Sequence, residues 1–237
     1  MPAQWKCPRL WPKGNAVIIG GGPSFKKVPC DVLKRLSLDE KIGVIGINKA
    51  YREIPDFSEW GHVIFFGDDR FYKVFSKKPD GFYKFPGLRV SCAGRKNDNA
   101  IHFLGRNRKK GHGICKQSHL VCWNKNSGGS AINLAYHLVG GGGKVFLFGF
   151  DMKKAGGGDS HWHNGYAGDF NQRKNHDVKI PFQRWLKTFP AIARDAERLK
   201  LEIYNVGSPN SKIDEFPKIT FNEFLEMVDK KREKLDD

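Results

Sequence analysis

The stretch Val17-Ile18-Ile19-Gly20-Gly21-Gly22-Pro23-Ser24 joins three β-branched residues directly to three glycines, a proline and a serine. β-Branched residues favour a strand, and the glycines allow a turn in which the backbone approaches a ligand closely. Successive N–H groups in such a turn, together with the Ser24 hydroxyl, can bind a phosphate. The pattern matches neither GxGxxG nor GxxxxGK[ST], which disfavours a dinucleotide cofactor and P-loop chemistry. We therefore expect a strand followed by a nucleotide-phosphate turn. A tight turn that needs glycine only for its geometry is the alternative.

Short apolar stretches alternate with amphipathic ones along the rest of the chain, which is typical of a parallel sheet covered by helices. Residues 42–48 and 144–150 are almost continuously apolar, as in strands buried on both faces. We predict an α/β, Rossmann-like fold with a mostly parallel sheet and helices on both faces. It forms one nucleotide-binding domain, 1–237, with an inserted basic lid over about 70–117 that includes a mobile loop at 105–113. The expected strands are 17–20, 42–48, 62–68, 120–123, 144–150 and 202–206, and the expected helices are 31–36, 129–138, 182–200 and 220–234.

The composition excludes several classes of protein. The chain has no run of 18 apolar residues, so we expect no membrane span, and its N-terminus lacks the apolar stretch of a secretory signal. Its five cysteines include no CxxC pair, which argues against a structural zinc site or a disulfide framework. We expect a cytoplasmic protein. The net charge of +16 favours an anionic partner: a nucleotide, an anionic acceptor or nucleic acid.

Polar residues follow several of the expected strands, at the edge where open α/β sheets bind ligands. Asn48 follows the second strand and can bind a ribose or base, or simply form a turn. Asp68 and Asp69 follow the third strand and can hold Mg²⁺, although capping a helix is the commoner role. Ser127-Gly128-Gly129 precedes a helix and can present N–H groups to an anion, with simple capping as the alternative.

The polar stretch that begins at Asp151 carries three histidines, His161, His163 and His176. Imidazoles are the natural acid–base groups near neutral pH. A metal site at His161 and His163 is disfavoured because no third His or Cys stands at ligand spacing. Trp162 can stack on a base or sugar, or anchor the loop.

The order of these segments resembles a known family. The motifs are GGGPS, GINxxY and FFGDD, each after a strand, and SGGSAINLAYHL before KVFLFGFD, followed by a histidine-bearing loop. In this order the chain is similar to the MptE-like group of 6-hydroxymethylpterin diphosphokinases and motility accessory factors. It is also similar to the small bacterial sialyltransferases that use CMP-sialic acid, and phage-encoded proteins with a His-Trp-His segment look closer still. The resemblance covers residues 17 to about 217.

The resemblance implies a nucleotide-dependent transferase, most readily a glycosyltransferase with a nucleotide-sugar donor, located in the host cytoplasm if phage-encoded. One alternative is a diphosphokinase that transfers pyrophosphate from ATP with Mg²⁺ on Asp68, Asp69 or Asp151. Another is a basic nucleic-acid-binding module on a non-catalytic scaffold. By the resemblance, Gly21, Gly22 and Ser24 would bind the donor phosphate. The nucleotide would contact Asn48, Ser127, Gly128 and Gly129, with Asp151 near the donor. His176, or His161 or His163 in its place, would deprotonate the acceptor.

Overall fold

A computed structural model describes residues 5–29, 31, 42–52, 62–78, 81–94, 98–154, 161–163 and 181–233, with side chains to residue 228. Within these ranges an eight-stranded sheet has the order β10-β9-β8-β1-β2-β3-β4-β5, and all its neighbouring strands run parallel. A small second sheet pairs β6 with β7. The predicted α/β, Rossmann-like fold is therefore confirmed. The strands are β1 (Asn15–Ile19), β2 (Ile42–Ile47), β3 (Val63–Phe66), β4 (Leu88–Ser91), β5 (His102–Phe103), β6 (Gly105–Arg106), β7 (Leu120–Val121), β8 (Lys144–Phe148), β9 (Glu202–Val206) and β10 (Lys218–Ile219).

The order of the strands reverses at β1. From β1 the chain adds β2, β3, β4 and β5 outward on one side, and then returns to place β8, β9 and β10 on the other. In open α/β sheets, ligands bind outside the carboxyl ends of the strands at such a reversal. The turns after β1 and β8 meet at this point, where the Gly22 N–H donates to the Gly149 carbonyl at 2.7 Å.

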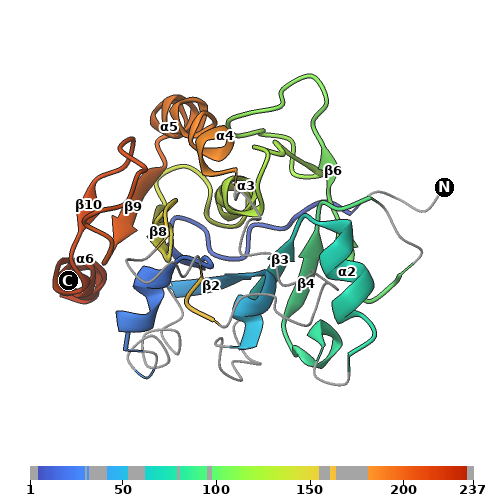
Figure 1. Ribbon diagram of the computed structural model, residues 1–237. Coiled ribbons are helices and arrows are strands. Elements are labelled where there is room, and N and C mark those ends of the chain that lie inside the picture. Colours follow the sequence, from blue (N-terminus) through green and yellow to red (C-terminus); the bar gives the residue numbers. More distant parts are fainter. Residues whose placement is uncertain are drawn as a thin grey trace.

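Helices cover both faces of the sheet, and each face has its own core. Along β1, Ile18 packs into the core beneath α3 and α5, whereas Val17 packs into the core formed with α2 and α6. Figure 1 shows α3, α4 and α5 grouped on one side of the sheet, with α6 beside its β10 end. Among the described helices, none has both the length and the apolar character that crossing a bilayer requires. The helices are η1 (Pro23–Lys27), η2 (Asn48–Arg52), α2 (Asp69–Phe75), η3 (Phe82–Lys84), α3 (Ser127–Val139), α4 (Phe182–Leu186), α5 (Phe189–Arg198) and α6 (Phe221–Glu233).

The stretch 182–200 forms two helices, α4 and α5, where the sequence predicted one. That prediction came from an apolar stripe at helical spacing, made of Trp185, Phe189, Ile192, Ala196 and Leu199. Pro190 lies in the first turn of α5 and has no N–H to continue the hydrogen bonds of a preceding helix. The Thr188 hydroxyl donates to the Trp185 carbonyl at 2.7 Å across the break. Phe189 and Ile192 are fully buried, as the stripe predicted. The helix expected over 31–36 lies outside the described residues apart from its first residue.

The inserted lid expected over 70–117 is not confirmed. β4 and β5 extend the main sheet, and α2 buries Phe71 and Phe75 in the core on one face. The strand signal of β4 is weak because only two of its four residues, Val90 and Ser91, are fully buried. The phenylalanines of this region, Phe71, Phe75, Phe82 and Phe85, therefore form core.

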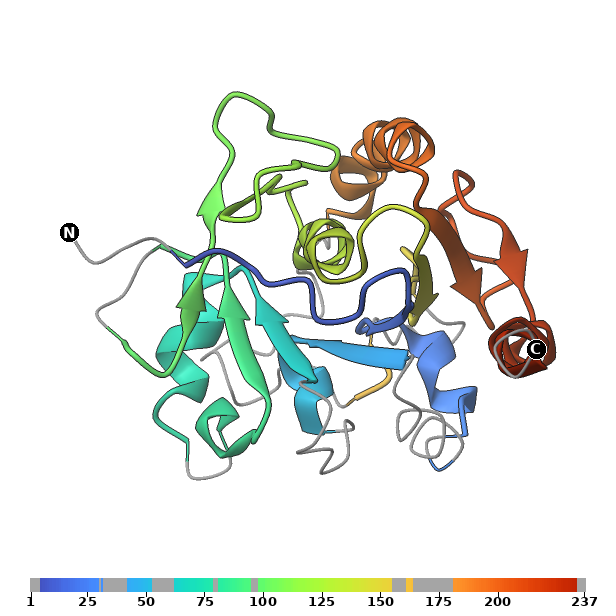
Figure 2. The ribbon, with the colours of Figure 1, turned by 180° about the vertical axis from the view of Figure 1, so that it is seen from behind.

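The N-terminal segment runs across the molecule beside α3 (Figure 2). Trp11 and Lys13 donate backbone N–H groups to the carbonyls of Leu138 and Val139 at 2.9 and 2.8 Å. The Trp11 ring lies so close to Gly43 in β2 that an ideal Cβ there would be 2.1 Å from the indole. The segment thus covers the end of α3 and the start of β2.

Candidate functional site

The glycine turn after β1 is closed by the carboxylate of Asp151, a side chain that is only 4 % exposed. One oxygen of Asp151 accepts hydrogen bonds from the backbone N–H and the hydroxyl of Ser24 at 3.1 and 2.9 Å. Its other oxygen accepts from the Ser208 hydroxyl at 2.8 Å. The structure thus brings Gly22, Ser24 and Asp151 together, but the two donors of Ser24 that we expected to hold a phosphate contact this carboxylate. Asp151 ties together the turns that follow β1, β8 and β9.

The His161-Trp162-His163 segment packs directly on the glycine turn. The Trp162 backbone N–H donates to the Gly21 carbonyl at 3.0 Å, and its indole N–H donates to the Gly20 carbonyl at 2.7 Å. An ideal Cβ on Gly21 would lie 2.9 Å from Cδ2 of His161. The His161 and His163 rings stack with their centroids 5.0 Å apart. The turn therefore needs glycine for a close approach, and this approach brings two imidazoles to the carboxyl end of β1.

Lys49 is a cation at this edge that sequence reasoning did not single out. It lies directly after β2, is 8 % exposed, and places its ammonium 5.6 Å from the centroid of the Phe75 ring. Burial, and then the positive charge of Lys49, lower the pKa of His161 below its ordinary value of 6.5. His161 is therefore neutral at pH 7 and able to accept a proton. The only sequence signal for Lys49 was its place beside Asn48.

Asn48 has two features that are unusual for a simple turn residue. Its φ of 54° lies in the left-handed region, which asparagine tolerates better than most residues. Its side-chain carbonyl oxygen is buried and has no hydrogen-bond partner among the described residues. An unsatisfied buried acceptor costs about 1–3 kcal/mol, and a ligand hydroxyl is a donor that would satisfy it. The role of Asn48 in nucleotide binding stays a prediction.

The N-terminus of α3 lies at the same edge, with a cap one residue earlier than expected. The N-cap is Asn126, whose side-chain oxygen accepts from the Gly129 N–H at 2.7 Å. The Ser127 hydroxyl instead accepts from the Gly67 N–H at 3.3 Å, just after β3. Ser127 therefore links α3 to the end of β3, while the capping role belongs to its neighbour.

The ring of Phe150 separates the two glycine turns. An ideal Cβ on Gly20 would lie 3.0 Å from Cδ2 and Cε2 of Phe150, and one on Gly128 would lie 3.0 Å from Cε1. Phe150 is 2 % exposed. The turn after β1 and the N-terminus of α3 thus converge on one buried ring that belongs to the core. That the two turns close on one ligand stays a prediction.

Two of the carboxylates proposed for Mg²⁺, Asp68 and Asp151, form hydrogen bonds or ion pairs within the protein. One oxygen of Asp68 accepts from the Arg70 N–H at 2.8 Å and caps α2, and the other pairs with the Arg70 guanidinium at 3.1 Å. Asp69 begins α2, and both oxygens of Asp151 accept hydrogen bonds. In the part of the chain that the structure describes, no group of three or more His, Cys, Asp or Glu side chains is placed to hold a metal ion. The described residues therefore offer Mg²⁺ no preformed set of ligands.

Arg106 is a second cation at this edge. Its Nε donates to the Cys92 carbonyl at 2.8 Å, and its Nη2 donates to the Gly67 carbonyl at 2.6 Å. The guanidinium lies over the Trp123 ring, 3.8 Å from the centroid. Arg106 therefore covers the ends of β3 and β4 instead of belonging to a mobile loop.

His176 lies outside the described residues, and among the residues that the structure describes His161 and His163 are the imidazoles packed on the glycine turn. The chain was also compared with protein-family models, curated proteins and solved structures, and none of them matches it. Any function must therefore be argued from the motifs and the geometry.

Proposed function

We propose that the carboxyl edge between β1 and β8 binds a nucleotide donor and that the protein transfers a group from this donor to an acceptor hydroxyl. The observation that carries the proposal is the packing of the His161 imidazole on Gly21, where the strand order reverses. A glycosyl group from a nucleotide sugar is the group that the motif order favours.

Three side chains have roles in this reaction. His161, neutral at pH 7, accepts the proton of the acceptor hydroxyl. The acceptor oxygen then bonds to the anomeric carbon while the bond from that carbon to the phosphate oxygen breaks, and the electron pair leaves with the nucleotide phosphate. The Lys49 ammonium stabilises the charge that develops on this phosphate. The unpartnered side-chain oxygen of Asn48 accepts a hydrogen bond from a ribose hydroxyl.

The test is donor consumption, with water as the acceptor. The purified protein is incubated with CMP-, UDP- and GDP-sugars and with ATP, and the released nucleotide is measured by chromatography. We expect one nucleotide sugar to be consumed, and His161→Gln to lower the rate about 10²- to 10⁴-fold, the usual contribution of a general base. His119→Gln, at a half-buried histidine beside β7, is the matched control and should keep the wild-type rate.

Two outcomes would contradict the proposal: no donor is consumed, or His161→Gln acts as fast as wild type. An EDTA arm separates the alternatives. The proposed transfer should continue in EDTA, whereas ATP consumption that EDTA abolishes would favour the diphosphokinase.

A further inference from the structure

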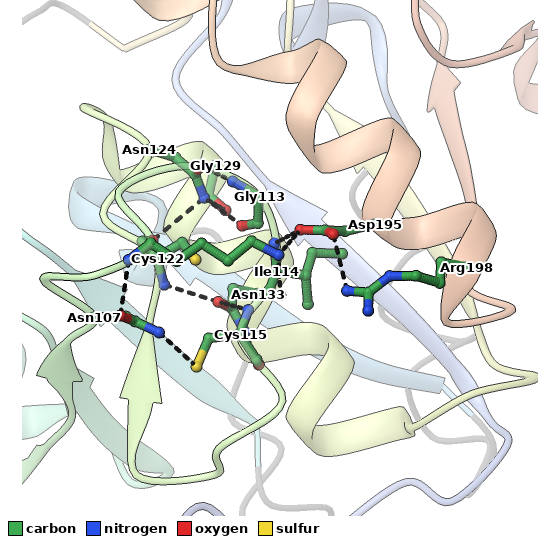
Figure 3. Close-up of polar contacts among 11 residues, drawn as sticks. Asn107, Gly113, Ile114, Cys115, Cys122, Asn124, Gly129, Asn133, Asp195 and Arg198 are labelled. Carbon is green, nitrogen blue, oxygen red and sulfur yellow. Dashed lines mark hydrogen bonds and ion pairs between the residues drawn. The ribbon is translucent and has the colours of Figure 1, made fainter.

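The side chains of Asn107, partly buried, and Asn124, fully buried, hold the basic loop between β6 and β7 in place (Figure 3). The Asn107 side-chain oxygen accepts from the N–H groups of Lys109 and Lys110 at 3.0 and 2.9 Å. Asn124, fully buried, accepts from the Gly113 N–H at 2.8 Å and donates to the Gly113 carbonyl at 3.0 Å. The loop is therefore part of the packed fold.

Asp195 of α5 divides the cations of this loop into two groups. It pairs with Lys110 at 2.5 Å and with Arg198 at 3.1 Å, and it accepts from the Ile114 N–H at 2.6 Å. Arg108 and Lys109 are exposed, and neither forms an ion pair with any residue that the structure describes. The loop thus uses Lys110 for its own structure and leaves the charges of its neighbours Arg108 and Lys109, and of exposed Lys116 further along, without an ion pair within the described chain.

A strained turn places a further exposed cation beside the loop. Asn124 and Lys125 both have left-handed φ values, 50° and 55°, although neither is glycine. Such residues cost of order 1–3 kcal/mol each and tend to occur at functional sites. The Asn124 amide supports the turn by donating to three carbonyls, including that of Gly129 at 3.0 Å. The Asn124 N–H donates to the Gly111 carbonyl at 3.1 Å, which fixes exposed Lys125 beside the loop.

The base of the basic loop adjoins the candidate site through Gly67. The Gly67 carbonyl accepts from Arg106, at the start of the loop, and its N–H donates to the hydroxyl of Ser127 at the N-terminus of α3. An ideal Cβ on Gly67 would lie 2.3 Å from the Trp123 ring. The base of the basic loop and the N-terminus of α3 therefore meet at one residue of the carboxyl edge.

We propose that Arg108, Lys109 and Lys125, the basic rim, bind the phosphodiester backbone of a nucleic acid. Hydrogen bonds of Asn107 and Asn124 hold the backbone beside these cations, and the net charge of +16 adds to the attraction of a regularly charged polyanion. A guanidinium recognises phosphate through paired hydrogen bonds. The exposed large apolar side chains of the described residues, Leu10 and Tyr83, lie outside the rim, so a lipid surface is not favoured.

The rim does not depend on the transfer chemistry. If both proposals hold, a bound strand would lie beside the donor site and could supply the acceptor hydroxyl.

The test measures binding of a fluorescent oligothymidylate of about 20 nucleotides by anisotropy, over a range of salt concentrations. The rim variant carries Arg108→Ala, Lys109→Ala and Lys125→Ala. A matched control removes one arginine and two lysines that are exposed elsewhere, through Lys84→Ala, Arg184→Ala and Lys187→Ala. At about 100 mM salt we expect the rim variant to bind at least tenfold more weakly than wild type. Its slope of log K against log salt should be shallower by about 2, since each phosphate contact contributes about 0.7.

Equal weakening in the two variants would show diffuse attraction by net charge and would overturn the proposal. Binding of heparin without binding of the oligonucleotide would assign the rim to a sulfated glycan and would also overturn it. If the triple rim variant does not fold, Lys109→Gln alone should still weaken binding more than Lys187→Gln. A protein that binds the strand but consumes no donor would refute the transferase proposal and leave this one standing.

Discussion

Replacing glycine by alanine should have three different effects at Gly22, Gly21 and Gly111. At Gly22 the φ is −69°, so alanine causes no backbone strain there. The new methyl would lie 2.1 Å from the Asp151 carboxylate and 2.5 Å from the Gly149 carbonyl oxygen. To make room, the carboxylate must give up its two hydrogen bonds to Ser24. Bonds to a charged group contribute about 1.5–3 kcal/mol each, and overpacking costs about 1–3 kcal/mol. We therefore expect Gly22→Ala to lower the free energy of unfolding by about 4 kcal/mol.

The other two glycines separate this effect from the loss of glycine itself. At Gly21 the new methyl would meet the imidazole edge of His161, a side chain that can move aside. Gly21→Ala should therefore cost about 1 kcal/mol of stability but displace His161, so donor consumption should fall far more than stability does. At Gly111 no atom lies within 4 Å of the new methyl. Gly111→Ala is the control and should stay within about 0.5 kcal/mol of wild type.

The assay is urea unfolding of the three variants beside wild type, with donor consumption measured on the same samples. By thermal unfolding, a loss of about 4 kcal/mol corresponds to a decrease in Tm of roughly 8–16 °C for a chain of this length. If Gly22→Ala unfolds at the same urea concentration as Gly111→Ala, the close contact between Gly22 and Asp151 is wrong. If Gly21→Ala keeps full activity, His161 does not act from its place on the turn.

Three further predictions concern Asp195, Asn124 and His161. Burial raises the pKa of Asp195, but the hydrogen bond from Lys110 and the other charged partners outweigh it and hold the pKa below its ordinary value of 3.8. The ion pair therefore stabilises the fold above that pH, and the stabilisation is lost as the pH falls through the lower pKa of the folded state. Asp195→Asn should make the free energy of unfolding depend less on pH below about pH 4. An unchanged pH dependence in acid would contradict the ion pair. Asn124→Ala removes four buried hydrogen bonds and should cost about 3–4 kcal/mol in urea unfolding, whereas a loss below about 1 kcal/mol would mean that the turn supports itself. If His161 is the base, activity should decline in acid with a midpoint below pH 6.5. Lys49→Met removes a positive charge that lowers the pKa of His161, so the midpoint should move to higher pH. A midpoint that does not move would exclude the influence of Lys49.

The strands at the centre of the sheet could be predicted because both of their faces are buried. β2 is a continuous apolar stretch, β8 is apolar after its first residue, Lys144, and β9 begins and ends at the predicted residues. β4 and β5 were missed because they are short and only partly buried, so their sequences carry little pattern. Pro190 marks the break between α4 and α5 in the sequence. The apolar stripe continues across the proline, however, and therefore led to the prediction of one helix.

The candidate site was predicted only in its backbone positions. The turns after β1 and β8 and the N-terminus of α3 meet at one edge because the topology is parallel, which sequence patterns indicate. The effect of Lys49 on His161 and the clamp of Asp151 on Ser24 depend on side chains more than a hundred residues apart, which no local pattern reports. Asn126 and Ser127 are both good N-caps, so the sequence could not decide which of them caps α3.

Calorimetric titration with CMP, UDP, GDP and ATP tests most directly whether the carboxyl edge binds a nucleotide. We predict that at least one of the four binds wild type with a Kd well below about 1 mM, and that Lys49→Met weakens this binding about tenfold, a loss of about 1.4 kcal/mol. The Lys187→Met control, at the exposed C-cap of α4, should bind as wild type does. If none of the four nucleotides binds more tightly than about 1 mM, the central claim is wrong.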